Sequence, residues 1–320
     1  MAQPTNTYDS YDSSVSIRED LEDVIYDISP EETPFYSACA KVKATNTYHE
    51  WLTDSLRSSA SNAHVEGDDT TAEARTAETR LGNYTQIFKN AVSIPDTDAG
   101  LDRAGKQKAM ARQMLKVAKE QKLDIEKALL DNNARAAGNS TTARELAGLP
   151  SWIVTNIDEA GDATAATGDG TDARTDGTAA AFTQARFDGV MQSIWEQGGK
   201  ASTVLLSPFQ LKAAVDGFTG MNNQRSTIGA SVGGTNSVVN AMDVYVTAFG
   251  TVEFVPSREL RARDVFVLQN DMFAVGVLRP TKNTELAKTG DSSRRQVVTE
   301  LTLIARNEKS SGAIYDCTTA

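Results

Sequence analysis

One polar stretch limits what this chain can fold into. Residues 57–80 read RSSASNAHVEGDDTTAEARTAETR, and Val65 is their only large apolar residue. Ordering a backbone costs about 1–2 kcal/mol per residue, and a segment with so little apolar surface cannot offset that cost by itself. The stretch is therefore either disordered or ordered by something outside this chain.

Two extended segments flank this polar stretch. The sequence looks extended over residues 45–56, and NYTQIFKNAVSIP at residues 83–95 has the pattern of a returning partner strand. We therefore predict a long β-hairpin with a polar tip. A protrusion of this kind is unusual in a solitary enzyme and favours a chain that works against neighbours.

The strongest helical pattern in the chain follows the hairpin. We predict a long helix between about residues 97 and 137, capped by Thr97 or Asp98 and ended near Asn132. Thirty residues of helix would span about 45 Å. Lys122 and Glu126 are spaced for an ion pair along its surface. One narrow stripe would pack against a sheet, and it consists of Met110, Met114, Val117, Gln121, Ile125 and Leu129.

The remaining segments divide into polar stretches and ordinary α/β patterns. Before the hairpin, a short amphipathic helix (SVSIREDLEDVIYDI) is followed by a strap with prolines at positions 30 and 34 and by a small helix over residues 34–40. Small and polar residues dominate residues 157–181, which we expect to be a solvated loop or insertion. From residue 182 onwards helices and strands alternate, with Ser207 capping a helix that begins at Pro208, and strands prevail towards the end.

Charge, hydropathy and cysteine content exclude several classes. The net charge is −11, with nine acids against one base in residues 1–40 and nine bases against five acids in residues 101–137. An acidic chain is a poor general binder of nucleic acid. No stretch has the length and apolarity of a membrane span or of a signal peptide, so we expect a soluble protein with no membrane partner. Cys39 and Cys317 are expected to be free thiols.

The motifs that suggest chemistry are weak. GASVG at residues 229–233 matches a nucleophile elbow around Ser231, but polar residues replace the strand and helix that this motif requires. Both histidines, His49 and His64, lie upstream of it. Residues 168–177 lack the closing glutamate of a calcium loop, and the scattered cysteines and histidines make no zinc site. We therefore expect no catalytic residue, cofactor or metal; an enzyme would require an activity that Ser231→Ala abolishes.

Several blocks of the sequence are similar to one protein family. REDLEDVIYDISPEETPFYSACAKVKATNTYHEW (residues 18–51), with its two spaced prolines, resembles the opening of tailed-bacteriophage major capsid proteins. GLPSWIVTN, IWEQGGKASTVLLSPFQLKAAVDGFTG and the strand-rich end from residue 245 to 316 resemble later blocks of that family, in the same order. The resemblance covers about residues 17–316 and implies an α+β fold of the Hong Kong 97 type.

The resemblance also implies a domain plan. Residues 1–44 would form an N-terminal arm, and residues 45–95 an extended β-hairpin loop that lies across a neighbouring subunit. Residues 96–181 would belong to a peripheral domain with a spine helix and a polar insertion. Residues 182–280 would be mainly an axial domain, and residues 281–320 would return to the peripheral domain as long strands. Some relatives weld subunits through a lysine in the hairpin, but residues 57–88 contain no lysine, so this crosslink is not expected.

The implied function is self-assembly into pentamers and hexamers of an icosahedral phage head around double-stranded DNA. The partners would be further copies, a portal, possibly scaffold or decoration proteins, and DNA bound without sequence specificity. The protein would be made in the bacterial host cytoplasm and reside in the virion. An encapsulin-like shell that encloses cargo proteins is the alternative, and its gene would lie beside a cargo gene rather than beside portal and terminase genes.

Charge and position suggest which residues meet a neighbour. Basic residues of the long helix are expected to face acidic residues of neighbouring arms, or the interior of the shell. The candidates for contacts between subunits are Asp20, Glu22, Asp23, Glu31, Glu32, Trp51, His64, Arg75, Arg80, Lys106, Lys108, Arg112, Lys116 and Lys119.

Overall fold

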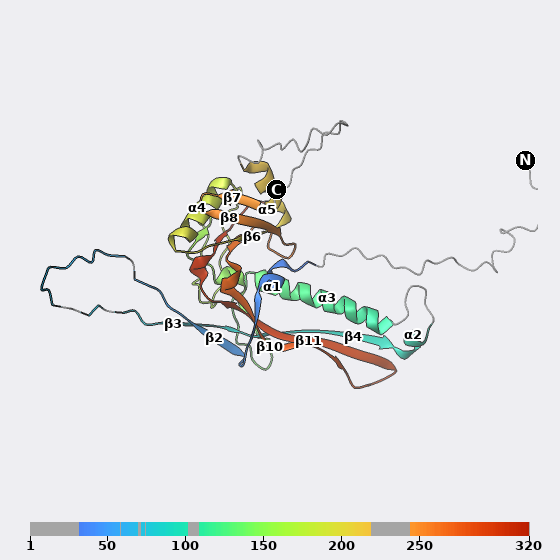
Figure 1. Cartoon of the computed structure of the whole chain (residues 1–320). Coiled ribbons are helices and arrows are strands. Elements are labelled where there is room, and N and C mark those ends of the chain that lie inside the picture. Colours follow the sequence, from blue (N-terminus) through green and yellow to red (C-terminus); the bar gives the residue numbers. More distant parts are fainter. Residues whose placement is uncertain are drawn as a thin grey trace, which may run out of the picture.

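The protein has a body of two layers from which one long hairpin projects (Figure 1). The computed structural model describes residues 32–57, 59–69, 72–73, 75–101, 109–218 and 244–319. Helices and strands both contribute to the body, as expected for an α+β chain. Within these residues, no helix combines the length and apolarity needed to cross a bilayer.

The lower layer is an elongated four-stranded sheet. Its strands, in the order β1 (Ala40–Lys43), β10 (Phe273–Glu285), β11 (Ser292–Ala305) and β4 (Gln86–Pro95), are antiparallel except for the parallel pair of β1 and β10. The register of β10 against β11 shifts twice, between Val277 and Arg279 and between Arg279 and Lys282. Irregularities of this kind bend a strand and increase its twist.

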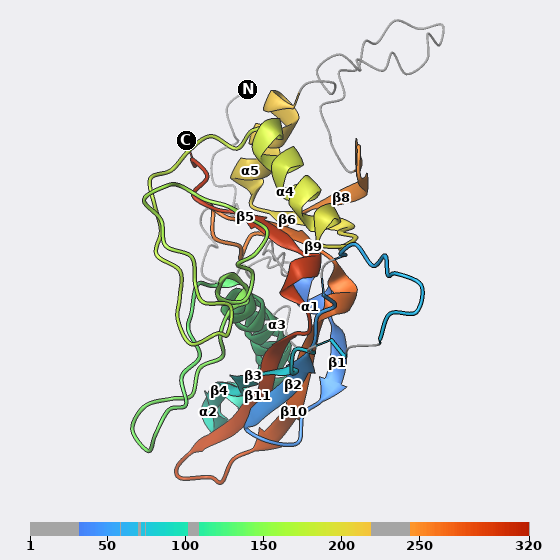
Figure 2. The same cartoon turned by 90° about the vertical axis from the view of Figure 1, so that its left-hand side faces the viewer.

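Helix α3 (Ala109–Leu130) lies along this sheet (Figures 1 and 2). The apolar stripe predicted from the sequence is confirmed, because Met114, Val117, Gln121, Ile125 and Leu129 are all buried. The prediction of one continuous helix from about residue 97 is wrong, and the described part of α3 has 22 residues and spans about 33 Å. The chain first forms a separate short helix, α2 (Asp96–Gly100), which ends at Leu101 in extended geometry.

The upper layer is a six-stranded sheet covered on one face by α4 (Gln184–Glu196) and α5 (Pro208–Gly217) (Figure 2). Its strand order is β5 (Ile157–Asp158), β12 (Gly312–Ile314), β9 (Val265–Leu268), β6 (Thr203–Leu206), β8 (Gly250–Pro256) and β7 (Val244–Thr247). The predicted cap is confirmed, since the Ser207 side chain accepts a hydrogen bond from the Gln210 N–H.

The central strands of the upper layer are buried on both faces. In β6, Val204 and Leu206 pack against the two helices, whereas Leu205 points into the core shared with the lower layer. That shared core includes Phe35 of α1 (Pro34–Ala38), Trp152 and Phe273. Three short 3-10 helices, η1 (Leu149–Ser151), η2 (Asn270–Met272) and η3 (Glu308–Ser310), connect elements at its edges.

The hairpin pairs differently from the sequence-based expectation. Strand β2 (Tyr48–Thr53) pairs with β3 (Thr79–Tyr84), which shares only Asn83 and Tyr84 with the expected partner segment 83–95. Most of that segment is β4, and it pairs with β11 instead. The cause is long-range: β11 offers ten consecutive residues as partners to β4, whereas β2 is only six residues long.

The expectation of a solvated loop or insertion over residues 157–181 fits most of this segment, in which only Ala166, Gly170 and Arg174 are buried. The segment begins as β5, makes a bridge between Thr164 and Thr175, and buries the side chain of Arg174 completely. Its small residues permit close packing: a Cβ added at Gly170 would lie 2.7 Å from the Trp152 ring. The segment is therefore a largely exposed loop that is attached to the body at a few buried points, Arg174 among them.

The C-terminal strands do not follow the domain boundaries implied by the resemblance. The proposed boundary at residues 280 and 281 falls inside β10, and the last strand, β12, joins the upper layer instead of lying beside α3. Cys39 and Cys317 are both buried free thiols, as expected.

Candidate functional site

The projecting part of the hairpin, residues 54–78, is the most exposed feature of the described chain (Figure 1). Every residue described in it is exposed, including Leu56 at 99% and Val65 at 81%. Its interactions are local: Arg57 pairs with Glu73 at 2.9 Å, and His64 lies 3.1 Å from Asp68. We call residues 54–78 the protrusion.

The base of the protrusion is fixed to the body. Trp51 of β2 lies against Trp152, with 5.3 Å between the ring centroids. The buried Asn83 side chain of β3 donates to the carbonyl oxygens of Ala147 and Leu303 and accepts from the Ala147 N–H at 2.9 Å. The two strands are thus attached to the body, whereas the described residues of 54–78 are exposed.

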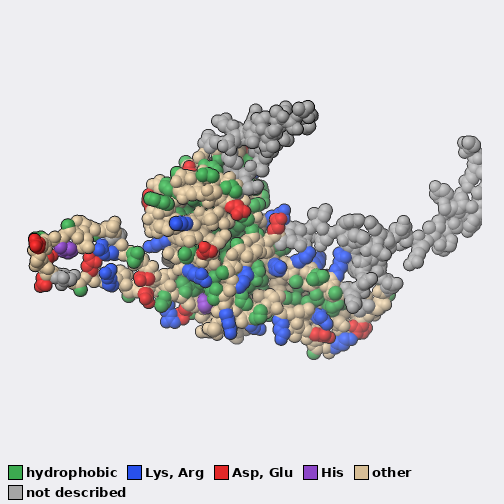
Figure 3. Space-filling view, viewed as in Figure 1, with side chains coloured by type: hydrophobic (Ala, Val, Ile, Leu, Met, Phe, Trp, Pro, Cys, Tyr) green, Lys and Arg blue, Asp and Glu red, His purple; other side chains and the backbone are tan. Residues whose placement is uncertain are grey.

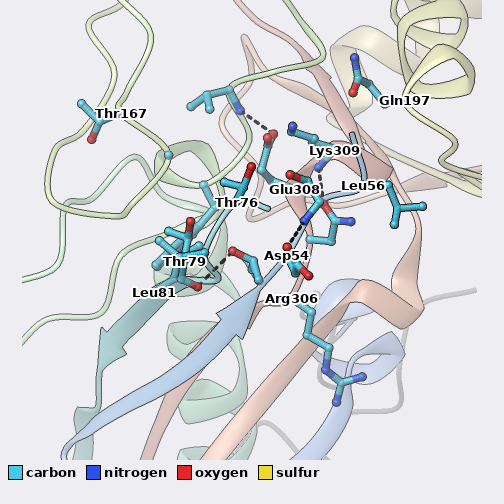
Figure 4. Close-up of a pocket in the computed structure, with 18 residues that line it drawn as sticks. Asp54, Leu56, Thr76, Thr79, Leu81, Thr167, Gln197, Arg306, Glu308 and Lys309 are labelled. Carbon is cyan, nitrogen blue, oxygen red and sulfur yellow. Dashed lines mark hydrogen bonds between the residues drawn. The ribbon is translucent and has the colours of Figure 1, made fainter. Parts of the chain in front are cut away.

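Hollows border the ribbon formed by β2 and β3. One, with a volume of about 610 Å³, lies between the base of the protrusion, η3 and the end of α4. Figure 4 shows Leu56, Lys309 and Gln197 around it. The other, of about 550 Å³, is lined by residues of β2 and its approach, including His49, whose pKa is lowered by burial.

The first hollow has a mixed character that does not resemble a catalytic centre. Of its two carboxylates, Glu308 accepts from the N–H groups of Val154 and Thr155 at 3.3 and 3.1 Å, and Asp54 accepts from the Ser55 N–H at 2.8 Å. Arg306 donates to the Asp271 carbonyl at 3.3 Å and is turned away from the hollow (Figure 4). The lining contains neither histidine nor cysteine. The lining is thus a mixture of polar and apolar side chains from the base of the protrusion and from the body.

The solvent face of α3 is basic. Lys116, Lys119, Lys122 and Lys127 are exposed, against only Glu120 and Asp124 among the exposed acids of the helix. Lys116 is 3.8 Å from Glu120, an exposed pair of little energetic weight. Lys and Arg side chains are visible along the lower layer in Figure 3.

A buried carboxylate fixes the start of the described chain. Glu126 of α3 accepts hydrogen bonds from the Phe35 and Tyr36 N–H groups of α1, at 2.9 and 2.7 Å. These N–H groups lie in the first turn of α1, where no helical partner exists for them. Burial raises the pKa of Glu126, although these hydrogen bonds and Lys41 oppose the rise. The predicted surface pair with Lys122 is therefore wrong, because Glu126 points into the body.

The residues expected at contacts between subunits lie in different environments in the structure. Asp20, Glu22, Asp23, Glu31, Lys106 and Lys108 lie outside the described residues, as does Ser231. Trp51 and Arg80 have partners within the chain, Trp152 and Glu50, respectively. Glu32 pairs with Arg258 at 3.6 Å while both stay exposed. His64 and Arg75 are exposed on the protrusion, and Arg112, Lys116 and Lys119 come together on α3.

Sequence reasoning missed the residues that hold these surfaces in place. Asn83, Glu126 and Glu300 are polar, buried and bonded to groups distant in sequence. Glu300, for example, accepts from Thr85, Arg144 and Arg279 at 2.6–2.8 Å. No local pattern distinguishes such residues from exposed polar ones. Over the described ranges no three histidine, cysteine or acidic residues are grouped so that they could hold a metal ion.

Comparisons with known proteins agree on one family. The model of the SU10 major capsid protein family matches residues 3–318. The major capsid protein of Escherichia phage Phieco32 is 25% identical over 352 aligned residues, which cover 98% of each chain.

Solved structures show the same fold. A capsid chain of cyanophage A-1(L) matches with a TM-score of 0.67 and 14% identity, covering 94% of this chain and 97% of that one. The SrpI encapsulin of Synechococcus elongatus matches with a TM-score of 0.57 and 9% identity, covering 98% and 97%. The expected Hong Kong 97-type capsid fold is thereby confirmed, and the chain, a phage major capsid protein, belongs to the SU10 major capsid protein family.

Proposed function

We propose that this capsid protein assembles into pentamers and hexamers of an icosahedral head that encloses double-stranded DNA. The observation that carries the proposal is the protrusion, whose described residues are all exposed, with Leu56 almost entirely in water. In a ring of identical subunits, a head-to-tail contact places the protrusion of each copy on the next. Each contact is modest, and many of them add up through effective concentration.

The hollows beside the ribbon support this reading. The anchored base leaves space on the body next to Leu56 and Lys309, where a segment of a neighbour fits without displacing core residues. The axial domain would correspond mainly to the upper layer, and the peripheral domain to α3 and the lower layer. The protein would act by binding copies of itself, without catalytic turnover.

Charge gives a second set of contacts. The acidic arm, with Asp20, Glu22, Asp23, Glu31 and Glu32, would meet the basic face of α3 on a neighbouring subunit. That face would combine Lys106, Lys108, Arg112, Lys116 and Lys119. Exposed pairs of this kind are screened by salt, so the yield of shells should fall as ionic strength rises from about 0.05 to 0.5 M. A yield independent of salt would exclude this pairing.

Further partners follow from the same role. A portal would occupy one vertex, scaffold or decoration proteins would bind the shell, and DNA would be held without sequence specificity. No membrane partner is needed. Synthesis would take place in the bacterial host cytoplasm, before incorporation into the virion.

The test is assembly of protrusion variants followed by negative-stain microscopy. Wild type should form shells, whereas Leu56→Asp combined with Val65→Asp should remain as subunits or small rings with an unchanged unfolding transition. Ser61→Asp is the matched control, since it adds a charge to the protrusion without removing an apolar group, and it should still form shells. Normal shells from the double variant would show that the protrusion does not carry assembly.

A second candidate is an encapsulin-like shell, favoured by the likeness to the SrpI encapsulin. The neighbouring genes separate the two: portal and terminase genes support the phage head, and a cargo gene with a docking peptide supports the encapsulin.

A further inference from the structure

Beyond the assembly surfaces, a buried group of charges joins three distant parts of the chain. Arg174 pairs with Asp316 at 2.7 Å and with Asp176 at 2.6 Å, and Arg263 reaches Asp316 at 2.8 Å. Arg261 pairs with Asp176 and lies 3.1 Å from Asp264. We call this group the buried charge cluster, and it consists of Glu159, Arg174, Asp176, Arg261, Arg263, Asp264 and Asp316. Arg174, Asp264 and Asp316 form its fully buried centre, and the other four side chains are 19–30% exposed.

The cluster holds the C-terminal segment against the upper layer. The Ala180 N–H donates to the Asp316 carbonyl at 2.7 Å, and the Cys317 N–H donates to the Arg263 carbonyl at 2.9 Å. The Thr318 N–H donates a hydrogen bond to the Ala180 carbonyl, also at 2.9 Å. Asp316 has a φ of 56°, a left-handed conformation that is uncommon for a residue with a side chain. The arginines and the Gly177 N–H that bind its carboxylate help to maintain this conformation.

The charges in the cluster do not balance. Four carboxylates face three guanidinium groups. Asp264 is completely buried, yet neither of its carboxyl oxygens accepts a hydrogen bond from any described residue. Its ion partner, Arg261, also serves Asp176. Burial without hydrogen bonds raises the free energy of an ionised carboxylate, so the protonated form of the group is favoured.

We propose that Asp264 is a proton-binding site, and that its protonation balances the buried charge cluster and tightens the hold on residues 315–319. The neutral carboxyl leaves three acids against three arginines. Ionisation of Asp264 restores an excess negative charge inside the fold, at the point where the C-terminal segment is bound.

The groups facing Asp264 agree with this assignment. Burial raises its pKa from 3.8 to about 6, with Arg261 and Arg174 opposing the rise and Asp176 and Asp316 adding to it. The neighbouring Tyr315 and Cys317 stay neutral, because burial raises the pKa of Tyr315 well above 10 and that of Cys317 to about 12. Asp316 stays ionised, because hydrogen bonding and attraction by Arg174 lower its pKa despite burial.

The sign of the pH effect follows from linkage. Because Asp264 binds its proton more tightly in the folded state, its contribution to stability is complete below pH 3.8 and is lost as the pH rises through about 6. Where opening of the C-terminal segment exposes Asp264 and returns its pKa to 3.8, the opening equilibrium should rise about tenfold between pH 5 and pH 7.5, which is the upper limit of the effect.

Hydrogen–deuterium exchange of the full-length chain tests the proposal. The reporters are the amides of Ala180, Cys317 and Thr318, corrected for the intrinsic pH dependence of exchange. Wild type should lose about tenfold in protection from pH 5 to pH 7.5. Asp264→Asn, which mimics the neutral acid, should show the wild-type pH 5 protection at both pH values. A wild type without this change, or an Asp264→Asn variant that keeps it, would overturn the proposal.

A control variant tests whether the pH effect is specific to Asp264, and NMR of the Asp264 carboxyl carbon gives a second measurement. Glu126→Gln removes another buried acid with a raised pKa, outside the cluster, and should leave the pH dependence of the three amides intact. Loss of the dependence in this control would contradict a role for Asp264. If Asp264→Asn fails to fold, the carboxyl carbon of Asp264 can be followed by NMR in wild type. A titration midpoint near pH 6 supports the site, and the absence of a titration between pH 4.5 and 7.5 overturns it.

Discussion

The base and the tip of the same hairpin differ in their contacts with the rest of the chain. In β2 and β3, side chains such as Trp51 and Asn83 bind residues of the body. In the protrusion, every described residue is exposed, and the pairs Arg57–Glu73 and His64–Asp68 join residues of the protrusion to each other. One hairpin therefore carries two kinds of surface. The base packs on residues of its own chain, whereas the described residues of the tip are exposed and available to a neighbouring subunit.

The largest expected effect breaks the anchorage of the base. Trp152→Ala removes a fully buried ring that packs on Trp51, and it should lower the free energy of unfolding of the unassembled subunit by about 3–5 kcal/mol. Urea denaturation measures this loss. Trp195→Ala is the control, since this tryptophan is 60% exposed and should cost under about 1 kcal/mol. Equal losses in the two variants would mean that the base is not held by the core.

A smaller loss is expected at the polar anchor. Asn83→Ala removes three buried hydrogen bonds and leaves the carbonyls of Ala147 and Leu303 and the Ala147 N–H without this partner. The free energy of unfolding should fall by about 2–3 kcal/mol. Asn90→Ala, which loses one exposed hydrogen bond to Asp124, should cost less than about 0.5 kcal/mol in the same measurement. Similar costs at both asparagines would argue against a polar anchor.

Close packing within the ribbon predicts a third effect. A Cβ added at Gly82 would lie 2.7 Å from the Tyr48 ring and 2.9 Å from a side-chain carbon of Glu50. Gly82→Ala should therefore cost about 1 kcal/mol or slightly more in thermal or urea unfolding. Gly100→Ala is the matched control, because a Cβ there meets no atom of the described residues within 4 Å and should not lower stability. Unchanged stability in Gly82→Ala would show that β2 and β3 can shift apart freely.

The smallest effect on subunit stability is expected at the tip. Leu56→Ala should change the free energy of unfolding by less than about 0.5 kcal/mol, because the side chain is 99% exposed. The same substitution should lower the yield of assembled shells, measured by sedimentation against Ser61→Ala. A loss above about 1 kcal/mol in the unassembled subunit would place Leu56 on its own body and remove the contrast between base and tip.

Sequence patterns predicted the features whose causes are local. The buried stripe of α3 follows from helical spacing, and the cap at Ser207 follows from one side chain and the next turn. The resemblance to capsid proteins identified the fold and the family. The exposure of residues 57–80 followed from their lack of apolar surface, as far as these residues are described.

Features whose causes lie far away in the chain were not predictable. β4 looks like the partner of β2 in sequence, yet the long β11, some 200 residues away, competes for it successfully. The burial of Arg174 within residues 157–181 was not predictable, because its ion partner, Asp316, lies 142 residues downstream. Glu126 has the spacing of a surface ion pair, and only the arrival of α1 shows that its carboxylate binds two N–H groups.

The paired register shifts in β10 have a structural consequence. They separate a buried half of the strand, which begins at Phe273, from an exposed half that ends at Glu285. Arg279, at the junction, is held to Glu300 of β11 at 2.7 Å. The shifts bend β10 at this point and increase its twist, whereas β11 stays paired with β4 over ten consecutive residues. The outer end of the sheet therefore combines a bent, exposed β10 with a β11 that β4 and the α3 side chains around Val297 hold in place.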